Sequence, residues 1–543
     1  GSNPSRIPDT VHFARGLAEQ LREYLEDHEE SAEAWSRLGQ ALHHIDSNVH
    51  EGGSLQPEAE YALKKSIELG LDPVLEATTR LTLAALLHSM AKMEESLDQA
   101  MEVLNGPHAA SLDPRVIAFA MNNRGSALHM LGRVEEAAEA FGEAARNHNY
   151  TSAWENLMMV HGEMGNLGKA EWRALAQEIK SRMATNGATD VPVQVCFALF
   201  RALDKAGDIE EAWSWLLYGN AAHAKGRLAH SPERTRANTN AIIAVFNANF
   251  WTPGLGHPSR TPVFIVGMMR SGSTLLEQML HAHPAVRGMG EDSVFNGQLP
   301  ALRDSIVTAT QQGPTGMVDA LKVQGILQDF GTRIEARMIE KVEEQRKGAR
   351  SPEEDQGPPR HVVEKMLTNF RNIGFIHLLY PNAVILHTVR DPMDTLFSCF
   401  KHRFDDTGLL WSSDMNALVD EYEAYLRLMA HWRRVLPGRV LDVHYEQLVQ
   451  EPEVVMRSVL ERLRLPWSAE VLKFHEKTDR VVLTHSMGQV RHGLSTKGFG
   501  AWKRYKRHLE PLMDDVRPRL LRMLHAGDLP FPDTIDWTLS GSS

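Results

Sequence analysis

The stretch TPVFIVGMMRSGSTLLEQMLH, residues 261–281, constrains the fold most, because it reads as a strand, a tight loop and a helix in direct succession. The apolar run from Val263 to Val266 predicts a buried strand, and apolar residues recur at helical spacing after Ser273. Backbone N–H groups where a loop opens a helix form a site for anions. We therefore predict an anion-binding loop at the end of a sheet strand.

The loop departs from the nucleotide-binding pattern G-x-x-x-x-G-K-[ST] at its most informative position. Gly267 and Gly272 fit the pattern, but Ser273 stands where the lysine belongs. Arg270 is the one cation of the loop, and Ser273 and Thr274 add hydroxyl groups. An ATP-dependent phosphotransferase remains an alternative, but this chain lacks the lysine that such an enzyme requires in the loop.

The chain has 543 residues, which is long for one core and predicts at least two domains. Residues 1–250 show helical apolar periodicity almost throughout, and the Pro- and Gly-rich segment 251–262 reads as a junction. From 251 to 543 we predict an α/β domain. The expected architecture is an all-α region followed by a P-loop-like α/β domain with a central parallel sheet.

A weak internal repeat runs through the helical region. Gly132 and Gly165 are 33 residues apart, and so are Ala137 and Ala170. This spacing resembles the tetratricopeptide (TPR) repeat, whose period is about 34 residues. We predict a TPR-like solenoid over 1–250, with an ordinary helical bundle as the alternative.

Three apolar runs of β-type residues predict strands in the α/β domain, at 263–266, 383–390 and 439–445. Helical patterns separate them, which favours a parallel sheet. The segment 341–360 is charged and then Pro-rich, and its second half reads as an exposed loop.

Two further segments carry candidate anion-binding groups. Arg390 ends the second predicted strand, and Ser398 follows in a helix expected to start near Pro392. An arginine there reaches a ligand at the carboxyl edge of the sheet; a salt bridge to a neighbouring aspartate is the alternative. The segment 484–505 is rich in hydroxyls, glycine and cations, and reads as a lid over an anion or as a solvated loop.

Taken together, residues 261–510 resemble the sulfotransferases that use 3′-phosphoadenosine 5′-phosphosulfate (PAPS). The string RSGSTLLEQMLHAHPAVRGMGE is similar to the tyrosylprotein sulfotransferases and their TPR-fused bacterial relatives. VRDPMDTLFSCF resembles the family's 3′-phosphate segment. The resemblance implies transfer of a sulfuryl group to an acceptor hydroxyl, with PAPS as co-substrate, 3′-phosphoadenosine 5′-phosphate (PAP) as product and no metal required.

The resemblance also implies roles for individual residues. Glu291 would be the catalytic base, with Arg270 and Lys365 near the transferring group. Residues implied to bind the nucleotide are Arg270, Ser271, Gly272, Ser273, Thr274, Arg390, Ser398, Tyr445, Ser486, Lys497 and Lys503. TKGFGAWK is only a shortened form of the family's late basic stretch, so which of Lys497 and Lys503 contacts the nucleotide stays open. His281 is expected on a helix surface and His283 in a turn.

The overall composition limits partners and location. A formal net charge of −12 argues against a general nucleic-acid binder, and two cysteines exclude a disulfide framework. No apolar run predicts a membrane span, and no signal peptide is visible. We expect a cytoplasmic protein, or one of the secretory lumen if an N-terminal anchor was removed.

The acceptor is expected to be a peptide or protein tyrosine, with glycan, lipid or small-molecule hydroxyls open. The repeats would bind protein or form a homodimer. A non-catalytic TPR scaffold is the remaining alternative.

Overall fold

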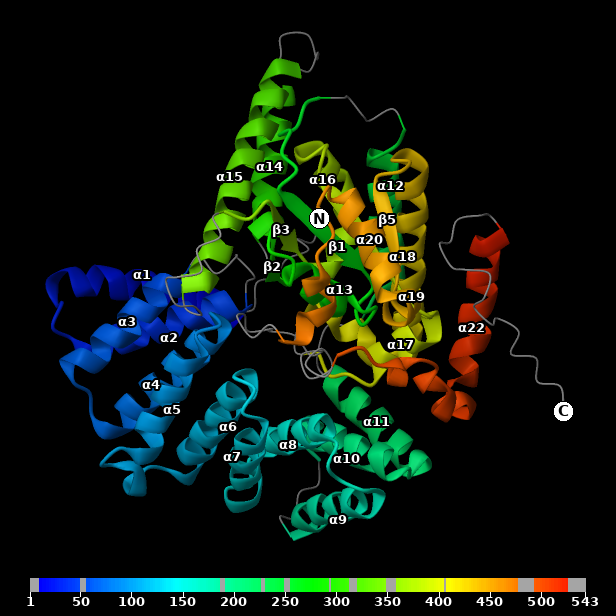
Figure 1. The fold of residues 1–543 in the computed structure, drawn as a ribbon. Helices are drawn as coiled ribbons and strands as arrows, with labels where there is room; N and C mark the ends of the chain where they lie inside the picture. Colours follow the sequence, from blue (N-terminus) through cyan, green and yellow to red (C-terminus); the bar gives the residue numbers. More distant parts are fainter. Residues whose placement is uncertain are drawn as a thin grey trace. The chain divides into compact units, whose positions relative to one another are not determined.

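A computed structural model describes residues 9–48, 55–185, 191–225, 230–248, 254–292, 294–311, 320–347, 358–404, 407–476 and 493–525. Contacts between residues divide the chain into two compact units, one ending at Gly207 and the other beginning at Asp208. The first unit is helical, and the second contains the sheet (Figure 1). The expected order of an all-α region followed by an α/β domain is confirmed.

Consecutive helices of the first unit pack against one another from α1 to α8, and both α8 and α9 pack against α10 (Figure 1). They are α1 (Asp9–Asp27), α2 (Ala32–Asn48), α3 (Gln56–Leu69), α4 (Pro73–Ser89), α5 (Met93–Asn105), α6 (Pro114–Met130), α7 (Val134–Asn147), α8 (Thr151–Met164), α9 (Lys169–Thr185) and α10 (Val193–Ala206). Aspartates cap α4 and α6, each of which has proline in its first turn.

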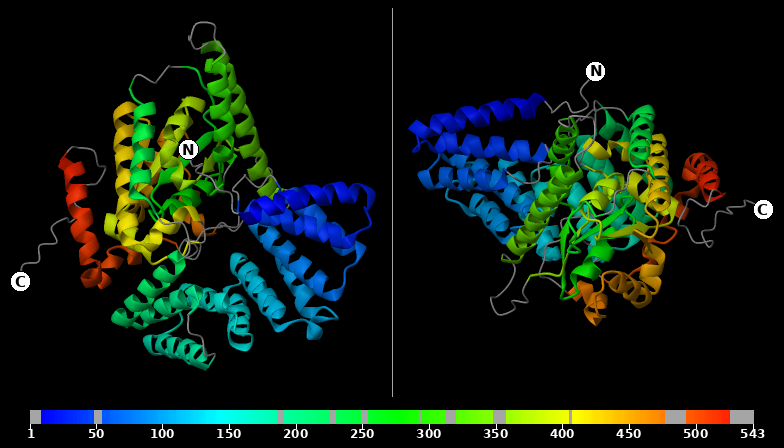
Figure 2. Two further views of the ribbon diagram at one scale, coloured as in Figure 1. Left: turned by 180° about the vertical axis from the view of Figure 1, so that it is seen from behind. Right: turned by 90° about the horizontal axis from the view of Figure 1, so that it is seen from above.

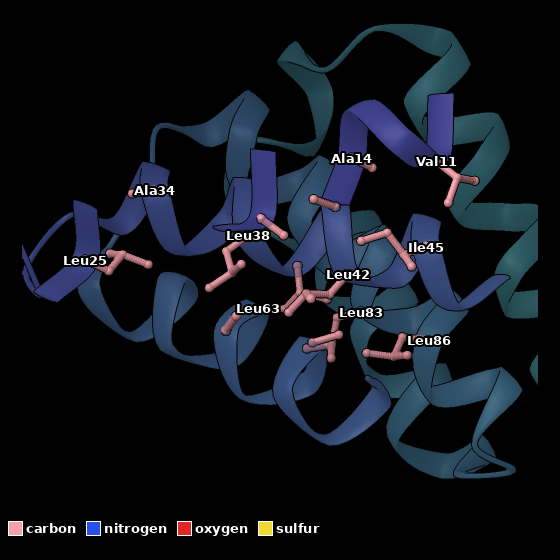
Figure 3. Close-up of a cluster of buried hydrophobic side chains, with 14 of the residues drawn as sticks. Val11, Ala14, Leu25, Ala34, Leu38, Leu42, Ile45, Leu63, Leu83 and Leu86 are labelled. Atoms are coloured by element: carbon pink, nitrogen blue, oxygen red, sulfur yellow. The ribbon is translucent and has the colours of Figure 1, made fainter. Parts of the chain in front are cut away.

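Small and large apolar residues alternate in the interior of this unit. Figure 3 shows the cluster formed between α1, α2, α3 and α4, where Leu38, Leu42, Leu63 and Leu83 are at most 2% exposed. Between α6 and α7, a Cβ placed on Gly125 would lie 2.7 Å from the Phe141 ring, so only glycine permits this approach. The close approach of paired helices is what the repeat pattern predicts.

Two polar contacts join residues that are 34 positions apart. Asn156 Nδ2 donates to Asn122 Oδ1 at 3.0 Å, and His129 Nε2 lies 2.6 Å from Glu163 Oε2. This separation matches the predicted period of the repeat. Assignment to the TPR family itself remains a prediction.

The second unit contains a five-stranded parallel sheet in the order β2-β3-β1-β4-β5. Its strands are β1 (Pro262–Gly267), β2 (Val286–Gly290), β3 (His361–Glu364), β4 (Val384–Val389) and β5 (Val440–His444). The three predicted apolar strands are confirmed as β1, β4 and β5. The sequence reading missed β2 and β3, which pair with each other and attach to β1 through β3.

Helices surround this sheet. They are α11 (Ile209–Ala224), α12 (Pro232–Val245), α13 (Ser273–His281), α14 (Val294–Gln311), α15 (Ala320–Lys347), α16 (Ile373–Leu379), α17 (Pro392–Phe400), α18 (Met415–Val435), α19 (Tyr445–Gln450), α20 (Pro452–Arg462) and α22 (Lys506–His525). Figure 2 shows α14 beside α15 and α12 beside α18, in agreement with their contacts. Residues 341–347 end α15; residues 348–357 of the predicted loop lie outside the described part of the chain.

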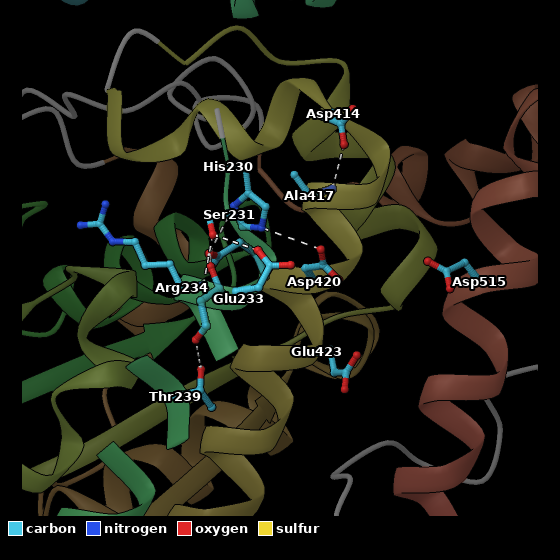
Figure 4. Close-up of polar contacts among 12 residues, drawn as sticks. His230, Ser231, Glu233, Arg234, Thr239, Asp414, Ala417, Asp420, Glu423 and Asp515 are labelled. Carbon is cyan, nitrogen blue, oxygen red and sulfur yellow. Dashed lines mark hydrogen bonds and ion pairs between the residues drawn. The ribbon is translucent and has the colours of Figure 1, made fainter. Parts of the chain in front are cut away.

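The second unit begins at Asp208, well before the predicted junction at 251–262. Its first helices pack on the α/β core: Thr235 Oγ1 donates to Glu421 Oε1 of α18 at 2.8 Å, and Asn220 Nδ2 donates to the Phe400 carbonyl at 3.0 Å. Figure 4 shows the start of α12, where Ser231 accepts a hydrogen bond from the Arg234 N–H. Helical periodicity predicts such helices, but it does not reveal which core they cover.

Candidate functional site

Predicted site residues follow all five strands at the carboxyl edge of the sheet. The anion loop follows β1, and the other strands are followed by Glu291 (β2), Lys365 (β3), Arg390 (β4) and Tyr445 (β5). Because the strands are parallel, these residues meet at one edge, where ligands of α/β proteins bind. The site residues selected from the sequence therefore lie along one edge of the sheet, although two of its strands were missed.

The loop 268–272 has a strained and closely packed backbone. Arg270 and Gly272 both have left-handed backbone conformations, with φ of 67° and 93°. A Cβ on Gly272 would lie 2.3 Å from the Tyr445 ring, so this position requires glycine. Ser271 Oγ lies 2.7 Å from Thr388 Oγ1, which ties the loop to β4. The loop opens α13, whose first residues Ser273 and Thr274 are each 5% exposed.

We name Arg270, Arg390, Ser398 and Tyr445 the arginine cluster. Arg270 Nε donates to Ser398 Oγ at 3.2 Å, and Arg390 Nη1 donates to the Arg270 carbonyl at 2.9 Å. The Arg390 guanidinium also lies 4.9 Å from the centre of the Tyr445 ring. These are four of the predicted nucleotide-binding residues, and the structure brings them together.

Arg390 keeps its charge available to a ligand. Among the described residues it forms no ion pair with a carboxylate, so the alternative of a salt bridge to Asp391 or Asp394 is not observed. Its partners are the carbonyl oxygens of Arg270 and Gly498, the latter at 2.7 Å. Its Nε is buried and has no hydrogen-bond partner among the described residues. A buried unpaired donor on a permanent cation fits an anionic ligand.

The segment 496–505 is held against α17 by Asp394, a residue that the sequence reading did not select. Asp394 is 3% exposed, and its carboxylate accepts hydrogen bonds from the Gly500 N–H at 2.6 Å and the Trp502 N–H at 3.2 Å. Lys497 and Lys503 are both exposed on this segment, and nothing in their placement decides which one binds a ligand. Ser486 lies outside the described residues.

We name Glu277, Glu291 and Lys365 the lysine–glutamate cluster. Lys365 Nζ donates to Glu291 Oε1 at 2.5 Å and lies 4.0 Å from Glu277 Oε2. Lys365 and Glu277 are fully buried, whereas Glu291 is 47% exposed. The adjacent Asp292 pairs with Lys341 instead. Glu291 therefore contacts both solvent and a buried ammonium.

Burial raises the pKa of three groups around the site. The pKa of Asp391, which caps α17, is raised to about 6. Burial raises the pKa of the Cys399 thiol to about 12, which makes it inert as a nucleophile. Burial also raises the pKa of Glu364, at the end of β3, well above its ordinary value.

The two histidines near the anion loop, His281 and His283, form hydrogen bonds that stabilise the fold. His283 Nδ1 accepts from the Ala285 N–H at 3.1 Å, which confirms its predicted place in a turn. His281 was predicted on a helix surface, and this was wrong: it is 8% exposed, and Nδ1 accepts from the Gly288 N–H at 3.1 Å. Helical spacing misplaced it because every side of the short α13 is buried.

The two clusters combine complementary chemistry at one edge. The arginine cluster offers cationic and hydroxyl groups to an anion, and the lysine–glutamate cluster offers a half-exposed carboxylate as a proton acceptor beside an ammonium. In the described part of the chain, no group of three or more metal-ligating side chains is placed to hold an ion. No described helix has the length and apolarity needed to cross a membrane.

Residues 262–469, which contain the five strands and all residues of both clusters, match the family model described as Sulfotransferase family. This stretch of the chain is therefore a domain of the sulfotransferase family, as the sequence resemblance implied. Its parallel α/β fold agrees with that assignment.

Several proteins are similar to this chain. An uncharacterized protein of Aquifex aeolicus is 30% identical over 59% of this chain and 40% of its own length. Protein-tyrosine sulfotransferase of Drosophila melanogaster is 29% identical over 39% of this chain and 40% of its own length. Protein-tyrosine sulfotransferase 1 of Danio rerio is 26% identical over 45% of this chain and 65% of its own length. The chain thus spans less than two thirds of each of these three relatives.

Two solved structures are also similar to part of this chain. The sulfotransferase domain of the Synechococcus PCC 7002 olefin synthase is 18% identical, with a TM-score of 0.31, and the match covers 47% of this chain and 90% of that one. Sulfotransferase STF9 from Mycobacterium avium is 16% identical, with a TM-score of 0.24, over 61% of this chain and 95% of that one.

Proposed function

We propose that this protein is a PAPS-dependent sulfotransferase that transfers a sulfuryl group to an acceptor hydroxyl, with Glu291 as the general base. The observation that carries the proposal is the meeting of the arginine cluster and the lysine–glutamate cluster at one edge of the sheet. The first supplies a site for a phosphorylated nucleotide, and the second supplies a base and a cation for the transfer.

In this proposal the arginine cluster binds PAPS. Arg390 and Ser398 contact its 3′-phosphate, and the N–H groups and hydroxyls at the start of α13 contact its 5′-phosphosulfate. Arg390 exchanges the Gly498 carbonyl for phosphate oxygens, and its buried Nε gains a partner. The Tyr445 ring stays against the guanidinium.

Glu291 accepts the proton of the acceptor hydroxyl as that oxygen attacks sulfur. The new O–S bond forms while the bond from sulfur to the bridging phosphate oxygen breaks, which gives a sulfate ester and PAP. Lys365 and Arg270 stabilise the charge that develops on the sulfuryl oxygens and on the departing phosphate. The transferred sulfuryl group carries less charge than a terminal phosphoryl group, so side-chain cations suffice and no metal ion is required.

A tyrosine in a peptide or protein is the favoured acceptor. Two of the relatives named above are protein-tyrosine sulfotransferases, and the side chain of Glu291 is 47% exposed, which leaves it accessible to a large acceptor. The helical unit would bind such a protein substrate or join two copies of the chain. Glycan, lipid and small-molecule hydroxyls are the other acceptors to be tested.

The proposal is tested by incubating the protein with PAPS and panels of acceptors in the presence of a metal chelator, tyrosine peptides first. Mass spectrometry should show a sulfated product together with one equivalent of PAP. Turnover of ATP that requires magnesium, with no sulfated product from any acceptor class, would contradict the proposal and favour a phosphotransferase.

A further inference from the structure

Glu277 is the one carboxylate of α13, a helix on which every residue is buried. It is fully buried itself, and its two oxygens face different partners. Oε1 accepts a hydrogen bond from the Gly290 N–H at 2.8 Å, and Oε2 lies 4.0 Å from Lys365 Nζ. A buried carboxylate is costly unless it is paired, so this placement requires a reason.

The first reason for the buried position of Glu277 is the charge of Lys365. Its side chain is fully buried and its ammonium faces two carboxylates, Glu291 at 2.5 Å and Glu277 at 4.0 Å. If Glu291 were the single counter-charge, its protonation would leave a buried ammonium without a neutralising partner. Breaking a buried pair in this way is strongly unfavourable.

We propose that Glu277 is a positioning residue that serves as the permanent counter-charge of Lys365, so that Glu291 is free to accept a proton. This inference rests on the proposed function. When the acceptor proton moves to Glu291, the attraction between Glu291 and Lys365 is lost. Glu277 still neutralises the ammonium, and Lys365 can turn its hydrogen-bond donors to the transferring group.

The second reason for the buried position of Glu277 is the hydrogen bond that it accepts from Gly290. Gly290 ends β2 with a left-handed backbone conformation (φ of 80°), and the pairing with β3 is irregular between Gly288 and Gly290. The Gly290 N–H therefore points out of the regular ladder and is satisfied by Glu277. Because Glu291 is the next residue, Glu277 also fixes the direction in which the base leaves the strand.

Glu277→Gln separates these two effects, because glutamine keeps an oxygen for the Gly290 N–H but removes the charge. We expect kcat for sulfuryl transfer to fall roughly tenfold to a hundredfold, while the KM for the acceptor and the Kd for PAP change less than about twofold. A loss of PAP affinity together with kcat would indicate a general structural role and would overturn the proposal, as would an unchanged kcat.

A double-mutant cycle tests whether Glu277 acts through Lys365. In a Lys365→Met background, adding Glu277→Gln should change kcat less than about twofold. Equal effects of Glu277→Gln in both backgrounds would contradict the proposal. Glu364→Gln is the matched control, because it replaces another fully buried glutamate at the same sheet edge that forms no ion pair with Lys365 among the described contacts.

A measurement independent of activity separates this inference from the proposed function. Lys365→Met leaves Glu277 buried without the ammonium of Lys365, so the urea midpoint of unfolding should fall. Adding Glu277→Gln to the Lys365→Met variant should restore most of the lost midpoint. Absence of this rescue would overturn the charge pairing. If the wild-type protein transferred sulfate to no acceptor but the rescue occurred, the proposed function would fail while the pairing stood.

Discussion

The two clusters at the carboxyl edge of the sheet hold their cations by different means. Arg390 of the arginine cluster donates to the carbonyl oxygens of Arg270 and Gly498, which carry no net charge. Lys365 of the lysine–glutamate cluster lies between two carboxylates. A cation held by carbonyl groups keeps its charge for an incoming anion, whereas a cation held by carboxylates supports proton transfer. The comparison assigns binding to one cluster and chemistry to the other.

The largest effect is expected from the proton acceptor of the lysine–glutamate cluster. Glu291→Gln should lower kcat by about 10²–10⁴-fold, because glutamine cannot take the acceptor proton, while PAP binds with unchanged affinity. Steady-state kinetics and calorimetry measure the two quantities. Asp292→Asn is the matched control, since Asp292 pairs with Lys341 and should leave kcat unchanged. Normal turnover of Glu291→Gln would remove this residue from the mechanism.

The arginine cluster should respond in the opposite way. Arg390→Ala should weaken PAP binding roughly tenfold to a hundredfold, because a charged hydrogen bond to the 3′-phosphate is lost, and should weaken AMP binding far less. Calorimetry on both nucleotides measures the difference. Arg427→Ala removes a partly buried arginine that donates to Asn240 and serves as the control. Equal losses for PAP and AMP would refute the 3′-phosphate assignment.

A smaller effect is expected where Asp394 holds the segment 496–505 against the arginine cluster. Asp394→Asn replaces one of the two oxygens that accept the Gly500 and Trp502 N–H groups, at a cost of about 1–3 kcal/mol. Hydrogen exchange at these two amides should accelerate, and PAP should bind about tenfold more weakly. Asp414→Asn, which alters the cap of α18, is the control. Unchanged exchange at both amides would show that Asp394 does not hold the segment.

The smallest effect concerns pH. The pKa of Asp391 is raised to about 6 by burial, so this carboxylate is charged at pH 7 and becomes neutral as pH falls below about 6. A negative charge next to Arg390 opposes anion binding, and its loss should tighten PAP binding by about threefold. Asp391→Asn keeps the helix cap and should bind PAP more tightly at pH 7. The ratio of the two affinities should approach one at pH 5; a constant ratio from pH 7 to pH 5 would contradict this role.

Much of the fold could be predicted from local pattern. Long apolar runs gave β1, β4 and β5, and proline marked the start of α17. β2 is five residues long with two glycines and β3 is four residues long, so neither has the length or the composition that marks a strand. The position of α11 and α12 on the α/β core depends on tertiary contacts that periodicity does not encode.

The residues of the candidate site likewise divide into those that local pattern predicts and those that depend on tertiary contacts. Arg270, Glu291, Lys365 and Arg390 were predicted because they stand in long strings that resemble one family. Glu277 and Asp394 were missed because their function depends on contacts with residues distant in sequence, Lys365 and the segment 496–505. A signal for Glu277 was present: it is a charged residue within an apolar run of a short helix, where burial would require a partner.

Calorimetry on the wild-type protein without magnesium, comparing PAP with AMP and ATP, tests the central claim most directly. The account predicts that PAP binds at least about tenfold more tightly than AMP or ATP, because Arg390 and Ser398 recognise a 3′-phosphate that the other two nucleotides lack. A preference for ATP, or binding that appears only with magnesium, would contradict the account and assign the loop after β1 to a phosphotransferase.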